Sequence, residues 1–172
     1  MSLSIEAGDV CGVRGIGELS DLIVAATGNG PWSHCGTIVA TAPFVMVCEA
    51  LDRVMVRPLD VRLNDAAHVW IVKPPLTPDQ RERAARRALE FVAQDYAYGN
   101  IIWQAMDALT QSRWFTEHRV RIIQGHEVGR VICSELDTEA EGTTIALPPN
   151  TASPNDIWGF AQVEKWPIVQ LS

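Results

Sequence analysis

The strongest secondary-structure signal in the chain lies in residues 32–51, which read WSHCGTIVATAPFVMVCEAL. Two runs of β-branched and apolar residues within it flank a short turn, a pattern typical of a β-hairpin. If the hairpin turns at residues 41–42, His34 lies directly opposite Glu49, with the two Cβ atoms about 5 Å apart. A glutamate there can orient the imidazole and stabilise its charged form. A partly exposed pair without function fits the same pattern, and a bulge would shift the register.

Strand-like and helix-like segments alternate on both sides of this hairpin. Strands are predicted near residues 8–13, 34–40, 44–51, 53–58, 68–72 and 162–170, and helices at 21–27, 77–95, 100–114 and after 131. The helix at 77–95 has a capping-box start with proline at its first position. Four successive short strands from residue 34 indicate an antiparallel meander. We therefore expect one α+β domain over 1–172, an antiparallel sheet or meander packed against helices.

Composition limits the classes of partner. Of the 172 residues, 47% are hydrophobic and 20% charged, and the formal net charge is −7, which argues against nucleic-acid binding. No apolar run approaches the roughly 20 residues that span a bilayer, so stable membrane insertion is not expected. The first residues do not resemble a signal peptide, which favours a cytoplasmic location. The sequence does not predict an oligomeric state.

The four cysteines differ in their surroundings. None is part of a CxxC pair, so neither a zinc ribbon nor a redox dithiol is predicted. Cys35 and Cys48 would face each other across the hairpin as buried thiols, on the side away from His34. Cys133, in RVICSEL, comes at or near the start of a predicted helix. Because a helix N-terminus favours a thiolate and its N–H groups can bind an oxyanion, Cys133 is the candidate nucleophile, although a buried small residue is the alternative.

Several of these segments together resemble a known family. They are LSDLIVAATGNGPWSHCGTIV, VMVCEALDRVMVRPL, VICSEL and SPNDI, within residues 8–157. They are similar to the circularly permuted NlpC-type papain-like cysteine hydrolases, with the YiiX-like branch closest and lecithin:retinol acyltransferase more distant. In that group the histidine strand precedes the cysteine helix. The resemblance implies a circularly permuted papain-like fold.

The resemblance also implies roles for individual residues. Cys133 would be the nucleophile, His34 its general base and Glu49 the orienting third member of a catalytic triad. Candidate substrate-binding residues are Tyr98, Trp32, Ser33 and Ser134. Asp137 departs from the pattern, which usually has an apolar residue after CSEL, and this affects the packing expected of the nucleophile helix.

The implied reaction is acyl transfer through a thioester, without a cofactor or metal. The first hypothesis is a hydrolase of amide bonds in a small peptide, amino-acid amide or cell-wall fragment. The second is a thiol acyltransferase or phospholipase acting on a lipid-like substrate, which predicts an exposed apolar entry surface. The third is a binding module that keeps the fold without activity. A zinc hydrolase is a more distant alternative, and it would need His34, Glu49 and Cys133 as its ligands.

Overall fold

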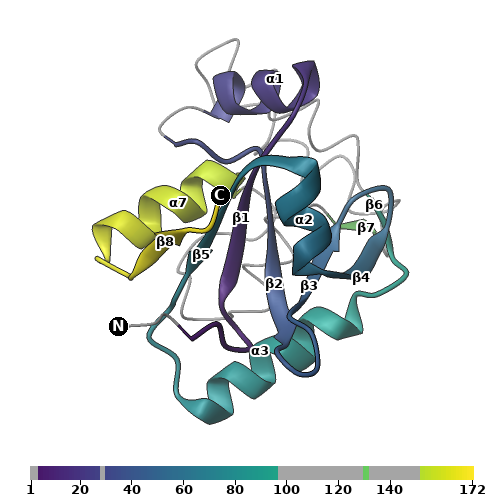
Figure 1. Ribbon diagram of the computed structural model, residues 1–172, viewed down its shortest axis with the longest axis vertical. Helices are drawn as coiled ribbons and strands as arrows, with labels where there is room; N and C mark the ends of the chain where they lie inside the picture. The colour runs from purple at the N-terminus through teal and green to yellow at the C-terminus, as the bar shows by residue number, and fades with distance from the viewer. Residues whose placement is uncertain (1–3, 28–29, 97–129, 132–151) are drawn as a thin grey trace, which may run out of the picture.

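A six-stranded antiparallel sheet lies at the centre of the part of the chain that the structure describes (Figure 1). This computed structural model describes residues 4–27, 30–96, 130–131 and 152–172. The sheet has the order β4-β3-β2-β1-β5-β8 and consists of β1 (Val10–Gly15), β2 (His34–Ala40), β3 (Met46–Ala50), β4 (Val54–Pro58), β5 (Ala66–Val72) and β8 (Ile168–Gln170). The described helices are α1 (Glu18–Thr27), α2 (Leu59–Asp65), α3 (Pro78–Glu90) and α7 (Pro154–Val163). Two short strands, β6 (Asp95–Tyr96) and β7 (Arg130–Val131), pair in parallel apart from the main sheet. This architecture confirms the α+β class.

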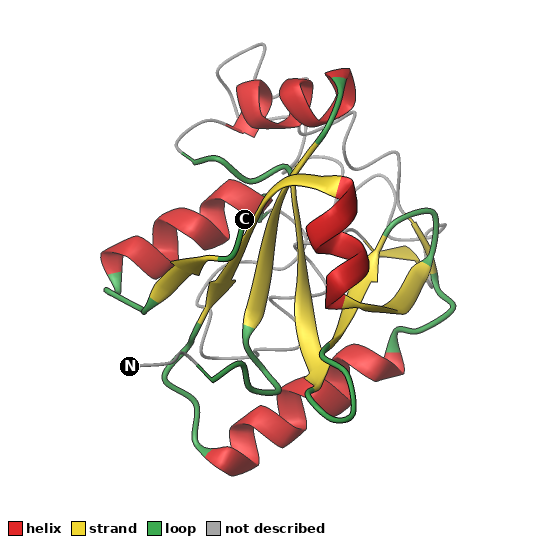
Figure 2. Ribbon diagram, viewed as in Figure 1, coloured by secondary structure: helices red, strands yellow, loops and turns green. Residues whose placement is uncertain are grey.

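The predicted four-stranded meander is correct for three strands and wrong for the fourth. β2, β3 and β4 follow one another in antiparallel pairs. β5 instead pairs with β1, on the far side of β2. The connection from β4 to β5 passes over one face of the sheet and contains α2, a helix of 7 residues that directly follows Pro58 (Figure 2). This helix was not predicted from the sequence. A helix of about two turns is too short for its apolar periodicity to be recognised in a sequence.

Two helices begin at capping boxes. In α3, as predicted, Gln80 N–H donates to Thr77 Oγ1 at 3.3 Å and Thr77 N–H donates to Gln80 Oε1 at 2.8 Å. In α7, Ser153 and Asp156 make the reciprocal bonds at 3.1 Å and 2.8 Å. No separate helix was predicted at these residues from the sequence. Pro154 occupies the first turn of α7, where proline favours a helix start because its missing N–H is not needed there.

The register of the β2–β3 hairpin differs from the prediction. Gly36, and not His34, lies opposite Glu49. The strands are connected by residues 41–45, which is longer than a two-residue turn, and the pairing also shifts between Ile38 and Ala40, where β2 has an irregularity. The displacement is by two residues. Since side chains alternate with a period of two, His34 and Glu49 remain on one face of the sheet as diagonal neighbours.

The two faces of the sheet bury separate apolar clusters. On the face covered by α3 and α7, the cluster includes Val10, Trp32, Cys35, Cys48, Trp70, Ala88, Ile157 and Ala161. On the face covered by α2, nearest the viewer in Figure 1, it includes Cys11, Val13, Ile38, Val47, Leu59, Val69 and Ile71. His34 and Glu49 alternate with Cys35 and Cys48, so both belong to the α2 face. The polar residues predicted for the site therefore meet α2 at this face.

Candidate functional site

His34 and Glu49 form a buried pair at the start of β2 and the end of β3. His34 Nε2 lies 2.9 Å from Glu49 Oε2, and 14% of the His34 side chain but only 1% of the Glu49 side chain is exposed. Gly36 makes this approach possible. A Cβ at Gly36 would lie 2.7 Å from the carbonyl oxygen of Cys48 and 3.0 Å from Glu49 Cβ. The predicted pairing of the two side chains is therefore present, although their backbone positions are diagonal.

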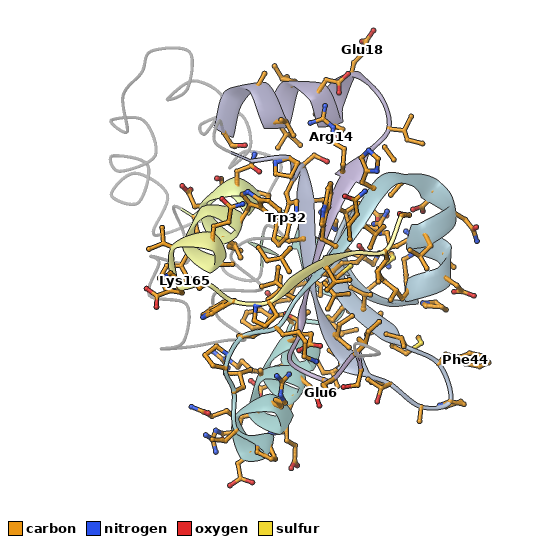
Figure 3. The ribbon with its side chains drawn as sticks, turned by 60° about the vertical axis from the view of Figure 1, so that its left-hand side comes forward. Glu6, Arg14, Glu18, Trp32, Phe44 and Lys165 are labelled. Carbon is orange, nitrogen blue, oxygen red and sulfur yellow. The ribbon has the colours of Figure 1, made fainter. Side chains whose placement is uncertain are left out.

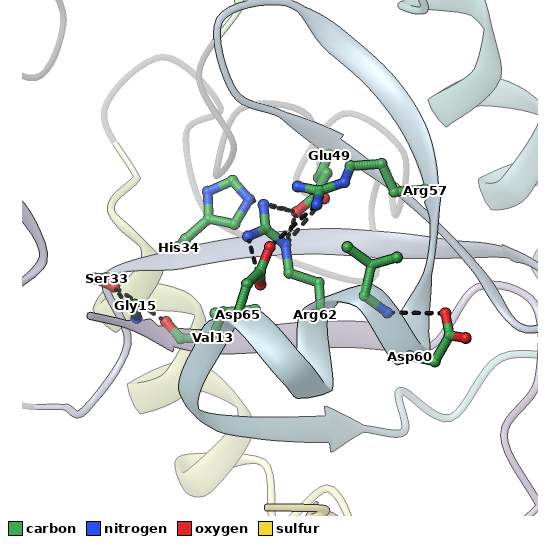
Figure 4. A network of polar contacts seen from close by, with 10 residues as sticks. Val13, Gly15, Ser33, His34, Glu49, Arg57, Asp60, Arg62 and Asp65 are labelled. Carbon is green, nitrogen blue, oxygen red and sulfur yellow. Dashed lines mark hydrogen bonds and ion pairs between the residues drawn. The ribbon is translucent and has the colours of Figure 1, made fainter.

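Arg62 of α2 is a second partner of Glu49 (Figure 4). Its Nε donates to Glu49 Oε1 at 3.0 Å and to Oε2 at 2.7 Å. Its Nη2 also lies 2.7 Å from Oε2, but not at an angle that makes a hydrogen bond. The sequence analysis missed Arg62, because nothing in a short charged segment after β4 indicates that one arginine turns inward. Arg62 thus holds the carboxylate from α2, whereas His34 contacts it from β2.

Two further charged residues complete the network around Glu49. Asp65 Oδ1 accepts from Arg62 Nη1 at 3.2 Å, and Asp65 Oδ2 accepts from Arg57 Nη2 at 3.1 Å. Arg57 Nη1 lies 3.7 Å from Glu49 Oε1. Basic and acidic side chains thus alternate from His34 through Glu49, Arg62 and Asp65 to Arg57. Asp65 is the more exposed carboxylate, with 40% of its side chain accessible.

The electrostatic environment keeps Glu49 ionised. Burial by itself would raise the pKa of this carboxyl, but the hydrogen bonds and positive charges of His34 and Arg62 outweigh burial and lower the pKa below its ordinary value. Burial also disfavours the Arg62 cation, and Glu49 and Asp65 reverse that effect, so the pKa of Arg62 is raised. A carboxylate can only accept hydrogen bonds, which assigns the hydrogen to His34 Nε2. In the neutral imidazole, Nδ1 then carries the lone pair.

Trp32 and Ser33 precede His34 and anchor the start of β2. Trp32 has no exposed surface, and its ring packs so closely on Gly12 that a Cβ there would be 1.9 Å from Cε2. Ser33 Oγ accepts from Gly15 N–H at 2.9 Å and from Ser20 Oγ of α1 at 2.7 Å. Figure 3 shows Trp32 between the sheet and α7. Both residues thus support the backbone that presents His34, and their contact with a substrate stays a prediction.

Some predicted site residues cannot be placed. Cys133, Tyr98 and Ser134 lie outside the described residues, as do the helices predicted at 100–114 and after 131. Their roles stay predictions. Among the residues that the structure describes, no three His, Cys, Asp or Glu side chains are grouped as metal ligands. None of the described helices is long and apolar enough to cross a membrane.

The described cysteines are buried on both faces of the sheet. Cys35 pairs with Gly12 of β1, and Cys48 pairs with Thr37 of β2, so the predicted direct opposition of the two thiols is wrong. Both belong to the cluster under α3, where Cys48 Sγ lies 3.4 Å from the carbonyl oxygen of Ala88. The shifted hairpin register accounts for the change. The expectation that both are buried on the side away from His34 is confirmed.

Comparison with known proteins identifies the fold. No protein-family model matches the chain, and no curated protein matches its sequence. The structure is similar to the crystal structure of metalloprotein yiiX from Escherichia coli O157:H7, DUF1105, with a TM-score of 0.50 and 14% sequence identity over 72% of this chain and 84% of that chain. The chain has a YiiX-like fold. At this level of identity the similarity shows the fold alone.

Proposed function

We propose that this protein is a cysteine hydrolase of amide bonds, with a permuted papain-like arrangement in which Cys133 is the nucleophile. His34 is its general base and Glu49 the orienting residue. The observation that supports the proposal is the buried contact of 2.9 Å between His34 Nε2 and Glu49 Oε2. Such a base held by a third group is what an acyl-transfer triad requires, whatever the chain order.

The proton movements follow from the tautomer that Glu49 imposes. His34 Nδ1 takes the Cys133 thiol proton, and the thiolate sulfur attacks the carbonyl carbon of the amide. The C–N bond then breaks, and Nδ1 returns the proton to the leaving amine. A water molecule, deprotonated by the same nitrogen, hydrolyses the thioester and restores the thiol. Throughout, Nε2–H remains bonded to Glu49, so the ring keeps its orientation and its positive charge is stabilised when it forms.

A metal centre at His34 and Glu49 is less well supported. The similar yiiX structure is that of a metalloprotein. In this chain, Glu49 already accepts hydrogen bonds from the buried Arg62 guanidinium at 2.7 and 3.0 Å, and Arg57 lies nearby. A divalent cation bound to this carboxylate would be repelled by both arginines. The contacts therefore favour an orienting role for Glu49 over metal binding.

A lipid-like acyl substrate is the second candidate. Ile16, which follows β1, is 74% exposed, and Leu19 and Leu22 of α1 are 60% and 52% exposed. The hydrogen bond between Ser20 Oγ and Ser33 Oγ joins this helix to the residue before His34. Exposed apolar side chains on a helix that is bonded to the residue before His34 fit an acyl chain. Hydrolysis of phosphatidylcholine vesicles that is lost in a Leu19→Ser, Leu22→Ser variant, with short amide substrates unaffected, would favour it.

The reactivity of Cys133 tests the proposal. Iodoacetamide labelling from pH 5 to 9, mapped by mass spectrometry, gives the rate at each cysteine. We expect Cys133 to react fastest, with a midpoint below the ordinary thiol value of about 8.5. His34→Ala should abolish this advantage, whereas His68→Ala, which alters an exposed histidine on β5, should preserve it. Ordinary labelling of Cys133 that ignores His34 would instead support the binding module.

A further inference from the structure

Glu49 is shared between two basic partners, His34 and Arg62, from different elements. His34 approaches its Oε2 from β2, and Arg62 contacts both oxygens from α2 (Figure 4). The Arg62 side chain is 11% exposed and that of Glu49 is 1% exposed. Interactions of charges shielded from water in this way are stronger than those on the surface. The charge and position of Arg62 therefore affect every group that is hydrogen-bonded to Glu49.

We propose that Arg62 is a positioning residue that acts on His34 through Glu49, holding the carboxylate in place and taking up part of its negative charge. This assignment deepens the proposed function, because it takes His34 as the general base. The geometric basis is that Nε of Arg62 bridges the two oxygens, which prevents the carboxylate from rotating away from His34. An orienting carboxylate without a second anchor would have one fixed oxygen only.

The same arrangement sets how strongly Glu49 stabilises the imidazolium form of His34. Among the residues that the structure describes, the charged groups around this pair are Arg62 and Asp65 of α2 and Arg57 of β4. A nearby positive charge disfavours protonation of an imidazole, and a negative charge favours it. Removing the Arg62 charge leaves the full negative charge of Glu49 to His34. The imidazolium then persists to higher pH, and the general base becomes available only at higher pH.

The alternative interpretation of the same contacts is that Arg62 only stabilises the packing of α2 on β3 and has no effect on His34. It predicts lower stability in Arg62 variants and an unchanged titration of His34. Stability measurements alone cannot separate the two readings, since both predict a loss. The titration of His34 separates them, because it depends on charge at Glu49 and does not require Cys133.

The experiment follows the Cε1–H resonance of His34 by NMR as a function of pH, assigned through a His34→Gln variant. In folded Arg62→Gln we expect the midpoint to rise by about one pH unit, which is the low end of the effect of an adjacent charge. Arg62→Lys, which keeps the charge, should restore the midpoint to within about 0.3 units of the starting protein. Arg57→Gln is the matched control and should change it little, since Arg57 Nη1 is 3.7 Å from the carboxylate.

Two further variants keep the test decisive. If Arg62→Gln does not fold, Arg62→Met removes the same charge and places an apolar chain in the buried space. In a Glu49→Gln background, the shift caused by removing Arg62 should fall below about half, because the effect passes through the carboxylate. An unchanged midpoint in folded Arg62→Gln or Arg62→Met, or an equal shift without Glu49, would overturn the proposal. Iodoacetamide labelling of Cys133 is a separate measurement. If the His34 midpoint shifts as expected but Cys133 reacts like an ordinary thiol, the result counts against the proposed hydrolase activity and not against the role of Arg62.

Discussion

Glu49→Gln is the substitution whose energetic effect follows most directly from the structure. The Glu49 side chain is 1% exposed and the Arg62 side chain is 11% exposed. The amide keeps the shape of the side chain but removes the negative charge, so the Arg62 cation is left buried. Breaking a buried ion pair in this way costs about 3–5 kcal/mol. Because Asp65 still lies 3.2 Å from Arg62 Nη1, we expect the lower value, about 3 kcal/mol.

Urea unfolding at pH 7 measures this cost. A loss of about 3 kcal/mol corresponds to a fall in Tm of roughly 6–12 °C for a chain of this size. Asp65→Asn is the control, and it should cost under about 1 kcal/mol because its carboxylate is partly exposed. Glu49→Leu combined with Arg62→Met should recover most of the loss, since no charge is then left buried. A cost below about 1 kcal/mol for Glu49→Gln, or no recovery in the double variant, would refute the reasoning.

Three other predictions concern close packing, capping and pH. Gly36→Ala should cost about 1–3 kcal/mol in urea unfolding, because its Cβ would meet the Cys48 carbonyl oxygen at 2.7 Å. Gly159→Ala in α7, where a Cβ meets nothing within 4 Å, should instead stabilise by about 0.5–1 kcal/mol, and equal costs at the two glycines would contradict this account. Thr77→Ala should lower stability by about 1 kcal/mol through loss of the α3 cap, while Thr77→Ser should not; a neutral alanine would show that the cap contributes nothing. The pKa of Glu49 is lower in the folded protein than its ordinary value near 4.5, so its contribution to the free energy of unfolding is fully present above 4.5 and is lost as pH falls through the folded value. The difference in free energy of unfolding between the starting protein and Glu49→Gln should therefore shrink in acid. A constant difference from pH 7 to 3 would argue against an ionised Glu49.

The sequence predicted those features that depend on local patterns. Runs of β-branched and apolar residues located β2 and β3, and the Thr77 capping box located α3, because each signal is contained in a few consecutive residues. The contact between His34 and Glu49 was also predicted, but from the wrong register. The two side chains remained on one face only because the longer connection and the irregularity in β2 together displaced the pairing by two residues, an even number.

The features that could not be predicted have no local sequence signal, and most of them depend on contacts between residues that are far apart in the sequence. α2 is too short to show a clear period, so the crossing from β4 to β5 was missed, and with it the entry of Arg62 into the site. An arginine in a charged segment is ordinarily exposed, and only the buried Glu49 beneath α2 explains why this one is not. The bond between Ser20 and Ser33 likewise joins residues that no local pattern connects.

The most direct test of the central claim is to trap the acyl-enzyme. The protein is mixed with 4-nitrophenyl acetate, quenched in acid and mapped by mass spectrometry, with His34→Ala and His68→Ala alongside. We expect acetylation at Cys133, slowed by about a hundredfold or more in His34→Ala and unchanged in His68→Ala, as for loss of a general base. Acetylation spread over several cysteines and lysines, at rates independent of His34, would contradict the assignment of Cys133 and His34 as nucleophile and base.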